Sequence, residues 1–509
     1  MFYSIQIILK EVHSISIFGK MKRFNFPTPY TILIIIIALS ALATWFLPAG
    51  SFDQLSYEEA VFQIRGSESI DIAANQRTLD SLGLTMDLAK FEEGKIRRPV
   101  SIPGTYHLSE TTPQGLLAVL YAPIKGIYES IDIILFVLII GGFIGVFQHS
   151  GAMDKGIAVL SQRMQGREKW LIVITVVLIA LGGTTFGLQE ETLAFYPILM
   201  PIFLAAGYDR LVTVGAIYCG SCVGYMGATI NPFSTIIASD AAGVNWTVGF
   251  YSRAAMLVFG VIVVSLYLVS YAERVKAEPK RSLVGLDKKA MSSQSVLVKL
   301  STINQFMLIL FGLTFLVMIY GVSQLGWWFE EMTALFLVAA IVLGIVQRAK
   351  EKAFVQAFVQ GAQDLLGVSL IIGVARGITI VLNDGNISGT LLNEAAAVVG
   401  NTSGVVFLPV LMLIFFIMTL FIASTSGLAL VSMPIMGALG NIVGVPTEEI
   451  VNAFLFGSGL MMFITPSGVV LPSLAMVKVP YNTWLKFMGK LLLMLGLLAA
   501  VILIIGYLV

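Results

Sequence analysis

Two adjacent acidic residues, Glu190 and Glu191, lie between the apolar runs 170–183 and 193–206. A charged side chain at the centre of a bilayer costs about 2.5–3.5 kcal/mol on insertion scales, so acids at such positions usually have a function. They could neutralise a cationic group of a solute, bind a proton or contribute to a cation site. The alternative is a position at the wet mouth of the segment, where both carboxylates are merely solvated.

Four short polar motifs interrupt the apolar segments. Those at 182–192 and 423–427 are rich in Gly, Ser or Thr, and those at 227–235 and 464–468 also contain a proline. Proline and glycine free backbone carbonyls inside a membrane, and Na⁺ favours oxygen ligands of this kind. The N-termini of half-helices at such breaks favour a carboxylate. The alternative is a set of simple kinks in which Ser and Thr bond back to their own helix.

Arg376 is the only basic residue in the apolar run 367–382. Its guanidinium could hold a solute carboxylate through a bidentate pair. It could instead neutralise an acid such as Glu190, Glu191 or Asp384, or form an ion pair that only fixes packing. The candidate solute- and ion-binding residues are Thr185, Glu190, Glu191, Thr192, Thr229, Asn231, Ser234, Thr235, Arg376, Ser424, Thr425, Ser426, Thr465 and Ser467.

The composition places these residues in a membrane protein. Of 509 residues, 57% are hydrophobic and only 12% are charged, which is about half the charged fraction of soluble domains and excludes a soluble enzyme. A net charge of +1 gives no reason to expect a nucleic-acid partner. The chain has no phosphate-binding loop sequence, so an ATP-driven pump is not expected. We predict no catalytic residues and no cofactor; the one expected ion is a coupling ion, Na⁺ or H⁺.

The distribution of Lys and Arg predicts the topology. Basic residues precede the first apolar run and fill the linker 272–301, whereas the stretch 383–404 has none. By the positive-inside rule the N-terminus and this linker are cytoplasmic, and 383–404 lies outside together with a polar insertion at 49–112. The insertion is typical of a hydrophilic loop or a small cap. Residues 1–20 precede Met21 and are interpreted as a possible non-native extension.

An internal repeat predicts the architecture. The sequence 200–202 recurs at 433–435, with an offset of 233 positions, and other short matches keep nearly the same offset. The charge rule gives the two copies, 21–271 and 302–509, opposite orientations. We therefore predict an all-α polytopic membrane protein with two inverted repeats, each containing a re-entrant hairpin and a broken transmembrane helix. Secondary transporters have this architecture and bind solutes near the midplane.

The motifs are similar to those of the YfcC/DcuC-like family of C4-dicarboxylate anaerobic carriers and basic amino acid antiporters. The resemblance covers nearly the whole chain from Met21 and is most specific at 185–187, 190–192, 227–235, 375–378, 424–427 and 465–468. This family belongs to the ion transporter superfamily. The resemblance implies a homodimer in which each protomer has a scaffold and a mobile part that contains both hairpins. It also implies an elevator-like movement of that part.

One departure from the related sodium–dicarboxylate carriers bears on the solute. Those relatives have Ser-Asn-Thr at their hairpin tips, whereas this chain has Glu-Glu-Thr at 190–192 and Ser-Thr-Ser at 424–426. Two acids beside the site repel a dianion and suit arginine, ornithine or lysine. We therefore expect a basic amino acid antiporter of the bacterial inner membrane. A sodium- or proton-coupled C4-dicarboxylate carrier is the alternative, and a channel or a membrane-embedded enzyme would be a different class.

Overall fold

The computed structural model describes residues 27–508, apart from 59, 67–68, 85, 93–95, 97–98, 154, 157–158, 160–165, 287–299, 326, 401, 403 and 423. The expected extension at 1–20 lies outside the described residues. Part of the predicted linker 272–301 also lies outside them, and helix α13 extends to Ala277, six residues beyond the predicted end of the first repeat at 271.

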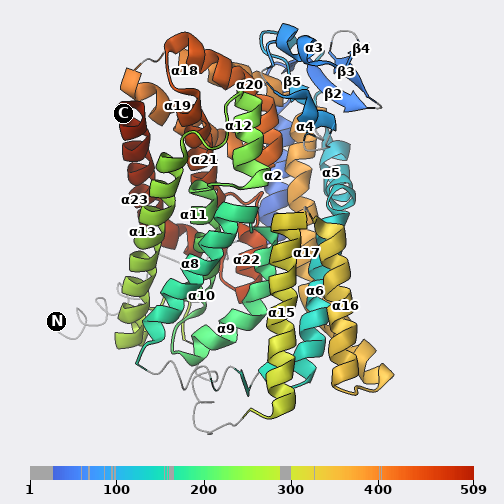
Figure 1. Cartoon of the computed structure of the whole chain (residues 1–509), viewed down its shortest axis with the longest axis vertical. Coiled ribbons are helices and arrows are strands. Elements are labelled where there is room, and N and C mark those ends of the chain that lie inside the picture. Colours follow the sequence, from blue (N-terminus) through green and yellow to red (C-terminus); the bar gives the residue numbers. More distant parts are fainter. Residues whose placement is uncertain are drawn as a thin grey trace, which may run out of the picture.

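Seven helices in the described part of the chain are long and apolar enough to cross a membrane, which confirms a polytopic membrane protein. They run roughly side by side in Figure 1. They are α6 (Ile131–His149), α8 (Glu168–Phe186), α13 (Phe250–Ala277), α15 (Thr302–Leu325), α16 (Phe329–Val346), α17 (Glu351–Asp384) and α23 (Tyr481–Leu508).

Shorter helices complete the helical part of the chain. They are α2 (Pro29–Ala43), α5 (Leu116–Glu129), α9 (Tyr196–Ala205), α10 (Arg210–Val214), α11 (Gly220–Met226), α12 (Ile237–Ala242), α18 (Ser388–Gly400), α19 (Phe407–Phe421), α20 (Thr425–Val443), α21 (Thr447–Met462) and α22 (Val470–Val477). Single turns of 3-10 or π helix join several of them, including a 3-10 helix at Glu190–Phe195 and a π turn at Pro232–Ile236.

The polar insertion at 49–112 forms a small cap that contains β-sheet, so the expectation of an all-α chain is wrong for this segment. Its larger antiparallel sheet has the strand order β4-β3-β2-β5, and a second sheet pairs β1 with β6. Leu55 and Phe62 are fully buried in neighbouring strands, so apolar side chains under one sheet face build the core of the cap. The elements are β1 (Gly50–Ser51), β2 (Gln54–Glu58), β3 (Val61–Arg65), β4 (Ser69–Ala73), α3 (Gln76–Ser81), α4 (Leu88–Glu92), β5 (Val100–Ser101) and β6 (His107–Leu108).

Glycines allow the long helix α17 to pack closely against α5 and α6. A Cβ atom on Gly141 would lie 2.5 Å from the carbonyl oxygen of Gly361, and one on Gly126 would lie 2.2 Å from that of Gly373. Small residues permit this backbone approach, which membrane helices use because the lipid supplies no hydrophobic driving force between helices. The same packing brings Gly126 to the Cβ atom of Arg376, so the end of α5 lies beside that arginine.

Helices α8 and α9, with the segment 187–195 that joins them, are called the first hairpin. The Nζ atom of Lys276, at the end of α13, lies 3.3 Å from an Oε atom of Glu168 at the start of α8. The same Nζ atom lies over the ring of Tyr208, just after α9, at 5.8 Å from its centroid. One side chain therefore contacts both ends of the hairpin, and the chain enters and leaves on the same face of the molecule.

Helices α19 and α20 form the second hairpin, which enters from the opposite face. Helix α18 packs against both of them and lies beside the cap, where the hydroxyl groups of Tyr106 and Thr390 are 3.1 Å apart. The amide of Gly50 also donates to the carbonyl of Asn386 at 2.9 Å. In Figure 1 the cap and α18 lie at one end of the molecule and α9 lies toward the other. The inverted repeat itself stays a prediction.

Labelling of single cysteines will test this arrangement. Lys169, Lys280 and Glu110 are exposed, and both natural cysteines are buried, so background labelling should be low. In intact cells, a membrane-impermeant maleimide should label Glu110→Cys at once and should label Lys169→Cys and Lys280→Cys only after lysis. Labelling of Lys169→Cys and Glu110→Cys from the same face would contradict the topology.

Candidate functional site

The first broken helix consists of α10, α11 and α12 and is interrupted at 227–235. Hydrogen bonds join this break to the first hairpin. The hydroxyl of Thr184 donates to the carbonyl of Gly227 at 2.6 Å, and the Nδ2 atom of Asn231 donates to the carbonyl of Gly183 at 3.1 Å. Asn231 also caps the turn that follows, because its Oδ1 atom accepts from the amide of Phe233 at 2.9 Å. These side chains supply the partners that backbone groups need at membrane depth.

The second broken helix consists of α21 and α22 and is interrupted at 464–468. Its free backbone carbonyls accept hydrogen bonds from side chains of α23. The indole of Trp484 donates to the carbonyl of Phe463 at 2.8 Å, and the Tyr481 hydroxyl donates to the carbonyl of Ile464. Within the break, the hydroxyl oxygens of Thr465 and Ser467 are 2.7 Å apart. Both broken helices thus keep a non-helical segment whose polar side chains remain directed toward the protein interior.

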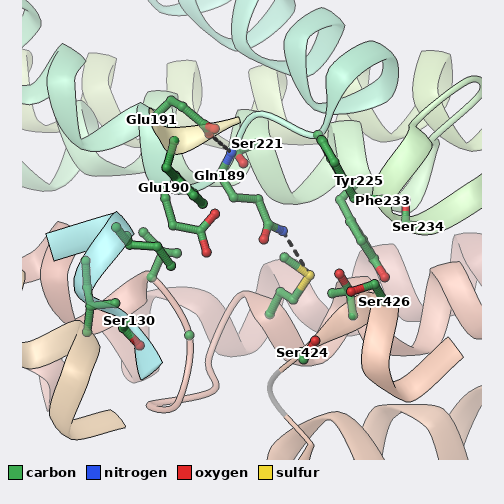
Figure 2. A pocket seen from close by; sticks show the side chains of 18 of the residues that line it. Ser130, Gln189, Glu190, Glu191, Ser221, Tyr225, Phe233, Ser234, Ser424 and Ser426 are labelled. Carbon is green, nitrogen blue, oxygen red and sulfur yellow. Dashed lines mark hydrogen bonds between the residues drawn. The ribbon is translucent and has the colours of Figure 1, made fainter. Parts of the chain in front are cut away.

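The two hairpin tips and the two broken helices meet at one cavity of about 300 Å³. Figure 2 shows side chains of both tips, among them Glu190, Ser424 and Ser426, around this space. Most of the predicted site residues line it: Glu190, Glu191, Asn231, Ser234, Arg376, Ser424, Thr425, Ser426, Thr465 and Ser467. The structure therefore brings together residues that are up to 277 positions apart, from Glu190 to Ser467.

Four predicted residues do not line the cavity, because their hydroxyl groups are bonded within the hairpin and the broken helix. These residues are Thr185, Thr192, Thr229 and Thr235. The Thr185 hydroxyl donates to the carbonyl of Leu181, and the Thr192 hydroxyl donates to that of Gln189. The Thr229 hydroxyl is hydrogen-bonded to the hydroxyl of Thr184, and the Thr235 hydroxyl donates to the carbonyl of Ala228. The geometry of Thr185 and Thr192 matches the alternative of local back-bonding, whereas Thr229 bonds to the first hairpin and Thr235 bonds across the break in the helix.

The first hairpin tip directs one of its two acids into the cavity. Figure 2 shows the Glu190 side chain pointing into the open space, whereas Glu191 turns back toward its own backbone. An Oε atom of Glu191 accepts from the amide of Gln189 at 3.1 Å. The Nε2 atom of Gln189 lies 3.4 Å from the sulfur of Met462 at the end of α21, so the tip also contacts the second broken helix.

Carboxylates dominate the charge of the cavity. Among the described residues that line it, the acids are Glu129, Asp132, Glu190 and Glu191, and the one basic side chain is Arg376. With all five ionised, the lining carries a formal charge of −3. In that fully ionised state the cavity would attract cations.

Arg376 is already engaged by an acid from the neighbouring helix. Its Nε atom lies 3.4 Å from an Oε atom of Glu129. Asp384, one of the acids considered as its partner, instead pairs with Lys125 at 2.8 Å. The pairing of Arg376 with Asp384 is therefore wrong, and the guanidinium belongs to the cavity.

The sequence analysis missed two groups of lining residues. Glu129 and Asp132 flank the junction of α5 and α6, where an acid next to an apolar run resembles an ordinary interfacial residue. Trp327 and Trp328 lie between α15 and α16, and Phe329 is the first residue of α16. Two consecutive tryptophans in a short connection were the available signal, but only the tertiary fold places them over the site.

Replacement of Gly187 by alanine will test the geometry of the first tip. Gly187 has a φ of +78°, and a Cβ atom there would lie 3.0 Å from both Phe233 and Asn231. A left-handed conformation costs an L-residue roughly 1–2 kcal/mol. We expect Gly187→Ala to lower the unfolding temperature in detergent and to impair uptake. Gly489→Ala is the matched control, because a Cβ atom there meets no neighbour within 4 Å; equal behaviour of the two variants would contradict the tip geometry.

Comparison with known proteins identifies relatives over nearly the full length. The family model DcuC, described as C4-dicarboxylate anaerobic carrier, matches residues 26–508. The chain is 38% identical over 497 residues to an uncharacterised protein of Haemophilus influenzae, with 96% of this chain and 98% of that protein covered. It is 27% identical over 506 residues to YfcC of Escherichia coli, a proposed basic amino acid antiporter, with 95% and 96% covered.

Two solved transporter structures also match the chain. The YdaH transporter of Alcanivorax borkumensis has a TM-score of 0.39 at 17% identity, with 94% of this chain and 98% of that chain covered. MtrF of Neisseria gonorrhoeae, described as illuminating a class of antimetabolite efflux pumps, has a TM-score of 0.37 at 16% identity, with 96% of each chain covered. The match of the family model to almost every residue shows that this chain belongs to the DcuC family of carriers, and it is a membrane transporter rather than an enzyme.

Proposed function

We propose that this protein is a secondary active transporter that exchanges basic amino acids across the bacterial inner membrane. The observation that carries the proposal is the charge of the cavity between the hairpin tips, whose lining includes four carboxyl groups and one arginine. Arginine, ornithine and lysine each bring a cationic side chain that would offset this excess. A neutral or anionic solute would leave it uncompensated.

The tip of the second hairpin offers a binding position for the negatively charged end of the solute. The Ser424 hydroxyl caps α20 and accepts from the amide of Gly427 at 3.1 Å, so the N-terminus of this 19-residue helix faces the cavity. Amide groups and the helix dipole at such a terminus favour a negative charge. We propose that the α-carboxylate of the solute binds at Ser424–Ser426 and that its cationic side chain extends toward Glu190.

A C4-dicarboxylate is the second candidate solute. The description of the family model favours it, and so does the presence of Arg376 in the cavity. The ion pair of Arg376 with Glu129 weighs against it, because the carboxylate offsets the guanidinium charge that would attract a solute carboxylate. Three further acids would also repel a dianion.

The packing of the helices suggests which part moves. Helices α2, α5, α6, α15, α16 and α17 contact one another as one group, and the cavity lies where this group meets the two hairpins and broken helices. We propose that the group is the scaffold of a homodimer and that the hairpins move past it like an elevator. The N-terminus is then cytoplasmic, and Na⁺ or H⁺ binding at the same polar tips would provide coupling.

Binding of radiolabelled arginine to the purified protein will test the role of Glu190. Hydrogen bonds to charged groups contribute about 1.5–3 kcal/mol, so Glu190→Gln should weaken arginine binding by roughly 10- to 100-fold. Glu351→Gln, at the exposed start of α17, should bind like the wild type. Unchanged arginine binding by Glu190→Gln, or an equal loss for arginine and succinate, would refute the charge argument.

A further inference from the structure

Aromatic side chains form one wall of the cavity beside its carboxylates. This aromatic wall consists of Phe233, Trp327, Trp328 and Phe329. Phe233 comes from the first broken helix, and the other three come from the connection between α15 and α16 and from the first residue of α16. None of the four carries a charge, so the proposed charge preference does not explain why aromatic residues line this side of the cavity.

The aromatic wall begins at the first hairpin tip. A Cβ atom on Gly187 would lie 3.0 Å from the ring of Phe233, so this ring lies against the tip that carries Glu190. The rings of Phe233 and Trp328 have centroids 4.7 Å apart at an interplanar angle of 62°.

The wall continues to the start of α6. The Trp328 and Phe329 rings are 5.2 Å apart, and the Phe329 ring lies 5.5 Å from that of Phe136. Phe136 is one helical turn beyond Asp132, which lines the cavity. The rings of Phe233, Trp328 and Phe329 therefore form one continuous aromatic cluster that packs onto Phe136 of α6.

Local contacts hold the two tryptophans in place. The amide of Trp327 donates to the carbonyl of Gly321 at 3.1 Å, and its ring packs so closely over Gly321 that a Cβ atom there would lie 2.1 Å away. The amide of Trp328 donates to an Oε atom of Glu331 at 2.9 Å. The backbone of Trp328 is therefore held in place by a hydrogen bond. The residue is 46% exposed.

We propose that the aromatic wall and the adjacent carboxylates form a guanidinium-binding subsite, so that the transporter prefers solutes with a guanidinium group to those with a primary ammonium group. This inference rests on the proposed transport of basic amino acids. A guanidinium is planar and weakly hydrated, stacks on aromatic faces and pairs with carboxylates in a bidentate manner. An ammonium is a compact, strongly hydrated charge that loses more on transfer to an aromatic surface.

Competition binding to the full-length protein tests the subsite. Lysine and homoarginine compete with radiolabelled arginine, and the ratio of their inhibition constants reports the head-group preference at equal chain length. The wild type should favour homoarginine. Trp328→Leu should reduce that preference by roughly 2- to 30-fold, the range that cation–π contacts of about 0.5–2 kcal/mol span. Trp328→Phe should retain part of it.

Trp170→Leu is the matched control, because Trp170 is exposed on α8 and does not line the cavity; it should leave the ratio unchanged. The proposal is overturned if the wild type binds lysine as tightly as homoarginine, a result that does not require any variant to fold. It is also overturned if Trp328→Leu binds arginine but keeps the wild-type ratio. Absence of any basic amino acid binding to the wild type would instead refute the proposed function itself.

Discussion

Where a helix is interrupted inside a bilayer, its backbone N–H and C=O groups need hydrogen-bond partners within the protein. This constraint determines how the two broken helices of this transporter are packed. Thr184 and Asn231 provide partners at the first broken helix, and Trp484 and Tyr481 provide them at the second. Each break is therefore tied to a neighbouring helix. The polar side chains that are not used in this way remain available to the cavity.

The same arrangement brings two oppositely directed hairpins to one space. Lys276 holds both ends of the first hairpin at one face, and α18 covers the second hairpin at the other. The tips then differ in charge, because one carries Glu190 and Glu191 and the other presents the N-terminus of α20. A solute with a carboxylate at one end and a cation at the other matches this polarity, and the aromatic wall adds a preference for the kind of cation.

The sequence predicted the local features well and the tertiary neighbours less well. Apolar runs interrupted by Gly, Pro, Ser and Thr located the hairpin tips and breaks, because these residue types are clustered there within a few positions. The contribution of Glu129 depends on the packing of α5 against α17, which no local pattern reveals. The sheet of the cap was missed because its strands have five residues or fewer and their apolar alternation is brief. Thr229 and Thr235 satisfied the pattern of a ligand, yet their hydroxyls complete the broken helix instead.

Counterflow in proteoliposomes tests the central claim, that the acidic cavity carries basic amino acids, most directly. Purified wild-type protein would be reconstituted into vesicles loaded with arginine, ornithine, lysine, succinate or fumarate, with and without a sodium gradient. The account predicts that internal basic amino acids accelerate uptake of labelled arginine, and that internal succinate and fumarate do not. Sodium-driven succinate uptake without arginine exchange would contradict it and would mean that Arg376 governs the site.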